Sequence, residues 1–78
     1  MSKLGDKIKE IRINEGLSQE AFAKELGYTS KSTINKIEKG INEISYDKFM
    51  LLIDKYNLTL DQIFENNSNN IPLPKNID

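Results

Sequence analysis

The chain of 78 residues contains no cysteine and no histidine. Without cysteine there are no disulfides, and without either residue the usual zinc-ligand sets cannot form. We therefore expect a cytoplasmic protein held together by its hydrophobic core, with no metal and no other cofactor. The same absences leave no nucleophile and base pair and no metal-ligand cluster, so we do not expect an enzyme.

Long apolar segments and strand patterns are also missing. The longest uninterrupted apolar run is 49–53, whereas a helix that spans a bilayer needs about 20 apolar residues. The N-terminus has no apolar stretch typical of a signal peptide, so we expect neither secretion nor a membrane partner. No segment alternates apolar and polar residues over a strand's length, which favours an all-α fold.

Helical spacing of apolar residues, together with helix start and stop signals, predicts five helices. They cover about 3–14, 18–26, 31–41, 45–56 and 59–64. Gly16 and Gly27 end the first two, and Ser18, Ser30 and Ser45 are placed as N-caps. The fifth begins with a T-x-x-Q capping box at Thr59.

These helices predict one compact domain over 1–65. The segment 66–78, NNSNNIPLPKNID, is rich in asparagine and holds both prolines of the chain. Such a composition buries little apolar surface against its ordering entropy, so we expect a flexible C-terminal tail.

Charge is distributed unevenly along the chain. The net charge is -1, from 11 basic and 12 acidic residues, which is not the basic balance typical of a nucleic-acid-binding protein. Segment 27–42, however, has three basic residues and one acidic residue, while 43–78 has three basic and six acidic residues. The positive excess therefore lies on the third predicted helix.

Plotted as a helix, segment 31–41 separates into two arcs. One is largely apolar and is expected to face the core: Ile34, Ile37, Glu38 and Ile41. The other is rich in hydrogen-bond donors and has no carboxylate: Lys31, Ser32, Asn35, Lys36 and Lys39. Each lysine alone is adequately explained as solvated surface. Asn35 is less easily explained so, because asparagine is a mediocre helix former but pairs with adenine in the major groove.

Two further features of this helix follow from the pattern. Its start is polar, with Ser30 and Thr33, and exposed helix N-termini attract phosphate. Glu38 lies on the inward arc, and Arg12 borders the apolar stripe of the first helix. Because a charge in such a place is costly unless it is paired, we expect an ion pair between Arg12 and Glu38.

The motifs LSQEAFAKELG (17–27) and STINKIEKG (32–40), preceded by IKEIR (8–12), resemble the Xre family of helix-turn-helix DNA-binding domains, which includes phage Cro and repressor N-terminal domains. The resemblance covers about 4–64 and implies a lambda-repressor-like fold whose third helix reads DNA. It implies base contacts from Lys31, Ser32, Asn35 and Lys36. With the polar helix start and Lys39, it implies backbone contacts from Gln19, Ser30, Thr33, Lys39, Asn42 and Tyr46.

Segment 41–64 is similar also to the N-terminal domains of Rgg/MutR-type regulators. Two departures from the Xre pattern stand out. The spacing from Gly27 to Ile34 is one residue longer than in the commonest Xre pattern. We interpret Tyr28 as the extra residue, and the insertion gives the base-facing residues a second possible register, displaced by one. Glu43 and Asp47 place negative charge near the fourth helix, which weakens its attraction for DNA.

The leading hypothesis is a sequence-specific transcriptional regulator, such as a repressor, that binds a double-stranded DNA operator as a homodimer through its third helix in the major groove. The alternative is a helical protein-interaction module, an antitoxin or anti-repressor partner without its own operator. The acidic net charge and the apolar residues of the tail favour that alternative.

Overall fold

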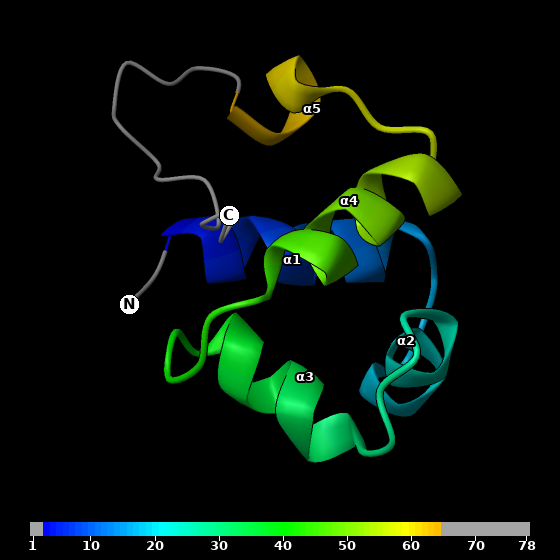
Figure 1. Cartoon of the computed structure of the whole chain (residues 1–78), viewed down its shortest axis with the longest axis vertical. Helices are drawn as coiled ribbons and strands as arrows, with labels where there is room; N and C mark the ends of the chain where they lie inside the picture. Colours follow the sequence, from blue (N-terminus) through cyan, green and yellow to red (C-terminus); the bar gives the residue numbers. More distant parts are fainter. Residues whose placement is uncertain (1–2, 65–78) are drawn as a thin grey trace. The chain divides into compact units, whose positions relative to one another are not determined.

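The computed structural model describes residues 3–64, and every regular element in that range is an α-helix (Figure 1). The helices are α1 (Lys3–Asn14), α2 (Gln19–Glu25), α3 (Lys31–Glu38), α4 (Tyr46–Lys55) and α5 (Leu60–Phe64). The predicted all-α fold with five helices is confirmed for this range. None of these helices is both long and apolar enough to cross a membrane. The predicted tail, 66–78, lies outside the described residues.

The chain divides into two compact units, Met1–Glu43 and Ile44–Asp78. The first unit holds α1, α2 and α3, and α3 packs against both of the others. Apolar side chains at helical spacing are buried in all three helices: Ile8, Ile11, Phe22, Ala23, Leu26, Ile34 and Ile37. Burial of one apolar face on each helix is the main term that stabilises such short helices, which are marginal when isolated in water.

The second unit contains α4 and α5. Its buried apolar side chains are Ile44, Phe49, Leu52 and Ile63. The predicted capping box opens α5: the Thr59 N–H donates to Gln62 Oε1 (2.7 Å) and the Gln62 N–H donates to Thr59 Oγ1 (3.1 Å). Several large apolar side chains of this unit remain exposed: Tyr46, Met50, Leu51 and Leu60.

Three serines begin helices as N-caps. Ser18 Oγ accepts a hydrogen bond from the Ala21 N–H (3.0 Å), Ser30 Oγ from the Ser32 N–H (3.1 Å), and Ser45 Oγ from the Lys48 N–H (3.2 Å). Each bond satisfies one backbone donor that the first turn of a helix leaves without an intrahelical acceptor. The predicted starts of α2, α3 and α4 are thereby confirmed.

The four longer helices all end in a Schellman motif, in which a residue of positive φ turns the chain back. The residues of positive φ are Gly16 (74°), Gly27 (81°), Gly40 (78°) and Asn57 (55°). The following N–H groups donate back across the helix end: Leu17 to Arg12 O (3.1 Å), Tyr28 to Ala23 O (2.8 Å), Ile41 to Lys36 O (2.8 Å) and Leu58 to Ile53 O (2.9 Å). The same local geometry therefore stops each of these helices.

One prediction for the third helix is wrong. Ile41 was expected on the buried arc, but its side chain is 66% exposed. The helix ends at Glu38, with Lys39 as C-cap, and Gly40 takes a left-handed conformation. Because the chain leaves the helical path at Gly40, the helical spacing that placed Ile41 beside Ile37 no longer applies.

Candidate nucleic-acid interface

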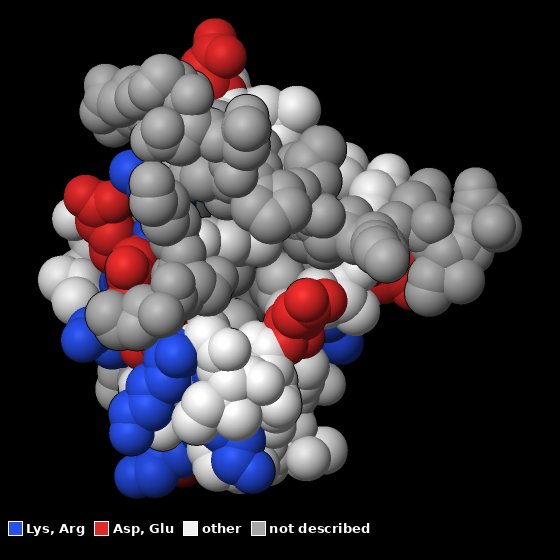
Figure 2. Space-filling view, turned by 90° about the vertical axis from the view of Figure 1, so that its left-hand side faces the viewer, with Lys and Arg blue, Asp and Glu red and all other residues white. Residues whose placement is uncertain are grey.

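The donor-rich arc of α3 lies on the surface of the first unit. Lys31, Ser32, Lys36 and Lys39 are exposed and Asn35 is half-buried. Within residues 3–64, none of the three lysines has a carboxylate at ion-pair distance. Figure 2 shows blue lysine and arginine atoms at the lower end of the view, where Figure 1 places α3, with white surface between them and little red. This arc can donate hydrogen bonds to an anionic partner.

The first turn of α3 is polar and solvent-accessible. Ser30 and Ser32 are exposed, Thr33 is half-buried, and the hydroxyl oxygens of Ser30 and Ser32 lie 2.8 Å apart. Ser30 Oγ already accepts from the Ser32 N–H. The two hydroxyls thus form a local hydrogen-bonded cluster at the helix start, and one of them is oriented by its capping role.

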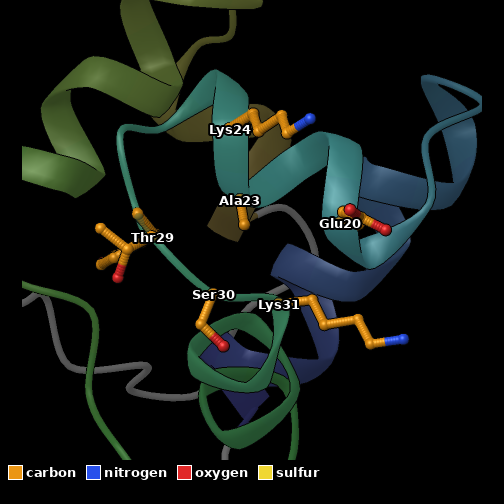
Figure 3. Close-up of a pocket in the computed structure, with 7 residues that line it drawn as sticks. Glu20, Ala23, Lys24, Thr29, Ser30 and Lys31 are labelled. Atoms are coloured by element: carbon orange, nitrogen blue, oxygen red, sulfur yellow. The ribbon is translucent and has the colours of Figure 1, made fainter.

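A hollow of about 190 Å³ lies where the segment between α2 and α3 turns (Figure 3). Its lining residues are Glu20, Ala23, Lys24, Tyr28, Thr29, Ser30 and Lys31. Figure 3 shows Ala23 on α2 facing the start of α3. Burial raises the pKa of the Tyr28 hydroxyl. The Tyr28 N–H donates to the Ala23 carbonyl (2.8 Å) and completes the turn after Gly27.

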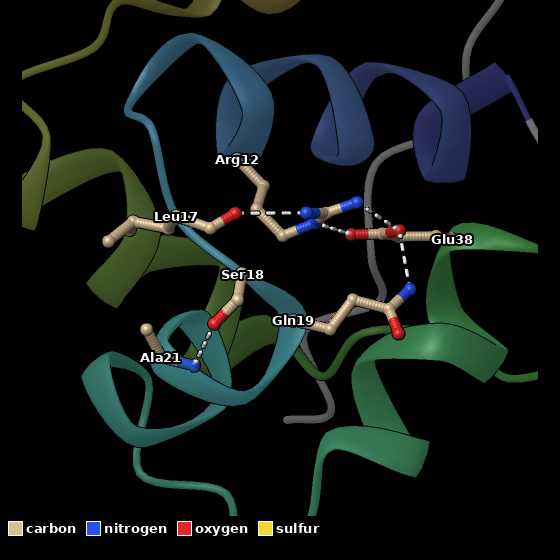
Figure 4. A network of polar contacts seen from close by, with 6 residues as sticks. All are labelled: Arg12, Leu17, Ser18, Gln19, Ala21 and Glu38. Atoms are coloured by element: carbon tan, nitrogen blue, oxygen red, sulfur yellow. Dashed lines mark hydrogen bonds and ion pairs between the residues drawn. The ribbon is translucent and has the colours of Figure 1, made fainter.

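A hydrogen-bonded network ties the C-terminal end of α3 to α1 and α2 (Figure 4). Arg12 Nε donates to Glu38 Oε2 (2.6 Å), and Arg12 Nη2 donates to Glu38 Oε1 (3.2 Å). The ion pair expected from the sequence is therefore present, and its side chains are only 12% and 3% exposed. Arg12 Nη1 also donates to the Leu17 carbonyl (2.9 Å), so the guanidinium bridges two helices and the turn between α1 and α2.

Gln19 is the third member of this network. Its Nε2 donates to Glu38 Oε1 (3.0 Å), and Figure 4 shows the side chain pointing from the start of α2 toward Glu38. The sequence suggested only a DNA-backbone contact for this residue. Glu38 thus accepts from a cation and from an amide, which satisfies a buried carboxylate that would otherwise be costly to desolvate.

Gly5 is a residue that the sequence analysis did not identify. It is buried on α1, and a Cβ added there would lie 2.4 Å from the Ile37 carbonyl oxygen and 2.9 Å from that of Glu38. The backbones of α1 and α3 are therefore in close contact. The only local signal was an isolated glycine inside a helical pattern, which often marks such an approach.

Comparison with known families agrees with this geometry. A family model described as helix-turn-helix matches residues 8–63. The chain belongs to the helix-turn-helix family. The resemblance of its sequence motifs is thereby confirmed, and α2, the turn at Gly27 and α3 are the elements that carry those motifs.

Two curated relatives of this helix-turn-helix chain are described as uncharacterized HTH-type transcriptional regulators. One is from Rickettsia prowazekii and one from Rickettsia conorii; each is 33% identical over 64 residues, which is 82% of this chain. The match covers 48% and 50% of the two relatives, so the chain spans about half of their length. No solved structure matches the chain.

The remaining predicted contacts of this helix-turn-helix chain lie outside α3. Asn42 is exposed and follows the end of α3 in the first unit. Its N–H donates to the Lys36 carbonyl (3.2 Å). Tyr46 is exposed at the start of α4 and belongs to the second unit. Contact of either residue with DNA stays a prediction.

Proposed function

We propose that this chain is a sequence-specific DNA-binding transcriptional regulator that acts in the cytoplasm by occupying an operator. In this proposal α3 enters the major groove and Lys31, Ser32, Asn35 and Lys36 lie at base edges. Gln19, Ser30, Thr33, Lys39, Asn42 and Tyr46 lie against the sugar-phosphate backbone, which sets the orientation of the protein but does not by itself select a sequence.

The observation that carries the proposal is the composition of the exposed face of α3. Three lysines, an amide and a hydroxyl share one side of a single helix that has no carboxylate on that side. A face that served only for solubility gains nothing from a mid-helix asparagine. Together with membership of the helix-turn-helix family, this face supports base reading by α3.

We propose that the active form is a homodimer. A two-fold axis presents two copies of α3 about 34 Å apart, which matches two half-sites about 10 bp apart on one face of the duplex. Dimerisation also doubles the number of phosphates contacted, which compensates for the net charge of -1 and the small positive excess of segment 27–42 in each copy.

Selection of bound fragments from random DNA, followed by sequencing, tests this function. We expect one enriched sequence with two-fold symmetry and a half-site spacing of about 10 bp. Enrichment of a single half-site would overturn the homodimer and leave the DNA-binding function in place. Recovery of sequences indistinguishable from the input would overturn sequence-specific binding.

The alternative is a helical protein-interaction module without its own operator. The exposed apolar side chains Met50, Leu51 and Leu60 of the second unit favour it, because apolar surface of this kind often contacts other proteins. A salt titration separates the two functions. DNA binding through lysines loses affinity steeply as salt rises, because counterions are released from the phosphates. The absence of any salt-sensitive complex with DNA at low ionic strength would favour the interaction module.

A further inference from the structure

Gly5 lies near the start of α1, against the C-terminal end of α3. The two nearest atoms that a Cβ at this position would meet, at 2.4 and 2.9 Å, are carbonyl oxygens of the α3 backbone. Neither can rotate away as the end of a flexible side chain can. Ordinary contact begins near 3.4 Å, so adding one methyl group requires the two helices to separate locally by about 1 Å, the difference between 2.4 and 3.4 Å.

Helix propensity does not explain a glycine here. Glycine inside a helix is less favourable than alanine, because it loses more backbone entropy on folding. Gly5 is inside α1, and its φ is not among the positive values that the structure records for Gly16, Gly27 and Gly40. The close approach of the α3 backbone is therefore the physical reason for glycine at this position.

The contact acts on the end of α3 that follows the base-facing residues. At its other end α3 is joined to α2 through a short turn, which is held by the Tyr28 N–H to Ala23 O bond (2.8 Å). With that end held, a shift at Ile37 and Glu38 tilts the helix rather than sliding it. A helix of 8 residues is about 12 Å long, so a 1 Å shift at one end tilts it by about 5°.

Such a tilt is large compared with the tolerance of a binding site. Asn35 and Lys36 precede the contact by one to three residues, so they move by a large share of the displacement. Binding constellations need their groups held within about 0.5 Å of the productive geometry. Contacts with phosphates through long lysine side chains tolerate more movement, because the side chains adjust.

We propose that Gly5 is a positioning residue that sets the angle of α3 and thereby its base preference. The proposal rests on the DNA-binding function proposed above. Because position 5 has no side chain, the backbone at the C-terminal end of α3 lies directly on α1. The ion pair between Arg12 and Glu38 ties the same end of α3 to α1.

The variant Gly5→Ala tests the proposal, with Gly16→Ala as the matched control. Gly16→Ala adds the same methyl group to the same chain at a strained φ of 74°, but with nothing within 4 Å of it. For each variant we would measure thermal unfolding, affinity for the selected operator, and affinity for duplex of random sequence at the same salt concentration. The ratio of the two affinities is the readout that a purely structural role would not move.

Both variants should unfold at a lower temperature than the wild type. Gly16→Ala should keep the affinity ratio within about twofold of the wild-type value, whereas Gly5→Ala should lower it by about tenfold or more, the range expected for one lost bidentate base contact. Affinity of Gly5→Ala for random duplex should change little. An unchanged ratio in folded Gly5→Ala would overturn the proposal, as would equal loss of both affinities.

Two further arrangements keep the test decisive. If Gly5→Ala does not fold, it is repeated with Asn57→Gly, which relieves the φ of 55° at Asn57 in the other unit. Failure of this double variant to fold would also overturn the proposal, because the contact would then be needed for folding rather than for setting the angle of α3.

If the wild type itself has no operator preference, the proposed function fails. Amide NMR shifts then test the positioning role by itself. Shifts along α3 in Gly5→Ala but not in Gly16→Ala support the positioning role, and shifts confined to α1 overturn it.

Discussion

At the scale of single residues, α3 carries one set of buried side chains and one set that lies at the surface. Ile34, Ile37 and Glu38 are buried and fix the helix to its neighbours. Asn35 and Lys36 lie between them in sequence and face outward or to the side. Because the two sets lie on different faces of the helix, substitutions on the outer face should change the proposed DNA binding and leave stability largely intact.

Asn35→Ala should relax base preference at one operator position and cost about 1 to 3 kcal/mol of specific binding. An amide that pairs with one base loses both hydrogen bonds on truncation. Lys39→Ala should instead weaken binding to all sequences and flatten its salt dependence. Lys36→Ala removes a proposed base contact together with a positive charge, so it should have both effects. Binding curves for the operator and for single-base variants measure both effects. Unchanged operator affinity in all three folded variants would show that another face binds DNA.

Arg12→Met should lower the free energy of unfolding by about 3 to 5 kcal/mol, because it leaves the buried Glu38 carboxylate with no cation. The matched control is Glu10→Gln, which breaks the exposed pair between Lys7 and Glu10 (2.9 Å) and should cost about 0 to 1 kcal/mol. Urea denaturation at neutral pH measures both. Similar losses in the two variants would mean that the Arg12 pair contributes no more than a surface pair.

Tyr28 should make stability fall at alkaline pH. Burial raises its pKa above the ordinary value of 10.0. A raised pKa favours the protonated form in the folded chain, so this contribution is fully present below pH 10 and is lost as pH rises from there through the folded pKa. The variant Tyr28→Phe lacks this contribution. The free energy of unfolding of the wild type, relative to that of the variant, should therefore fall above about pH 10. Urea midpoints of both proteins from about pH 8 to 11 measure this, and parallel curves would contradict it.

At the scale of helices, the boundaries are set by a few local groups. Serine hydroxyls start α2, α3 and α4, and residues of positive φ end the four longer helices. These signals act over four or five residues, and the three serines, Gly16 and Gly27 were identified from the sequence, whereas Gly40 and Asn57 were not. The prediction for the end of α3 was wrong because helical spacing was extended past Gly40, although the same signal had ended the first two helices correctly.

Asn57 is the one non-glycine residue among those four helix ends. Asn57→Gly should raise the free energy of unfolding by about 0.5 kcal/mol, since glycine takes a positive φ without strain, and Asn57→Ala should lower it by about 1 kcal/mol. The two variants serve as controls for each other, because both remove the amide. Chemical denaturation measures the difference, and equal stability of the two would show that the turn does not constrain this residue.

At the scale of the whole molecule, charge separates along the chain. The exposed lysines of α3 are followed by Glu43 and Asp47, both exposed. Net charge of this kind governs nonspecific binding and association rates more than it governs the fold. The one match to the helix-turn-helix family model covers 8–63 and so includes parts of both units.

Glu43→Gln combined with Asp47→Asn should strengthen binding to all DNA sequences by about threefold to tenfold at low salt, because two repulsive charges are removed. The gain should shrink at high salt through screening. Asp54→Asn combined with Asp61→Asn, which neutralises two exposed acids of α4 and α5, is the charge-matched control and should have a smaller effect. Equal gains from the two double substitutions would indicate a general charge effect without a preferred face.

The sequence by itself determined the five helices except for the end of α3, the serine N-caps, and the pairing of Arg12 with Glu38. Each of these depends on periodicity, on a capping side chain, or on the cost of burying a lone charge, and all three can be read from local pattern. The exposure of Ile41 follows from the local turn at Gly40, past which the helical spacing was extended. Tertiary structure alone decided that Gly5 lies on the end of α3 and that Gln19 donates to Glu38. Both depend on how closely segments far apart in the chain approach in space, and that distance is fixed only when the helices pack.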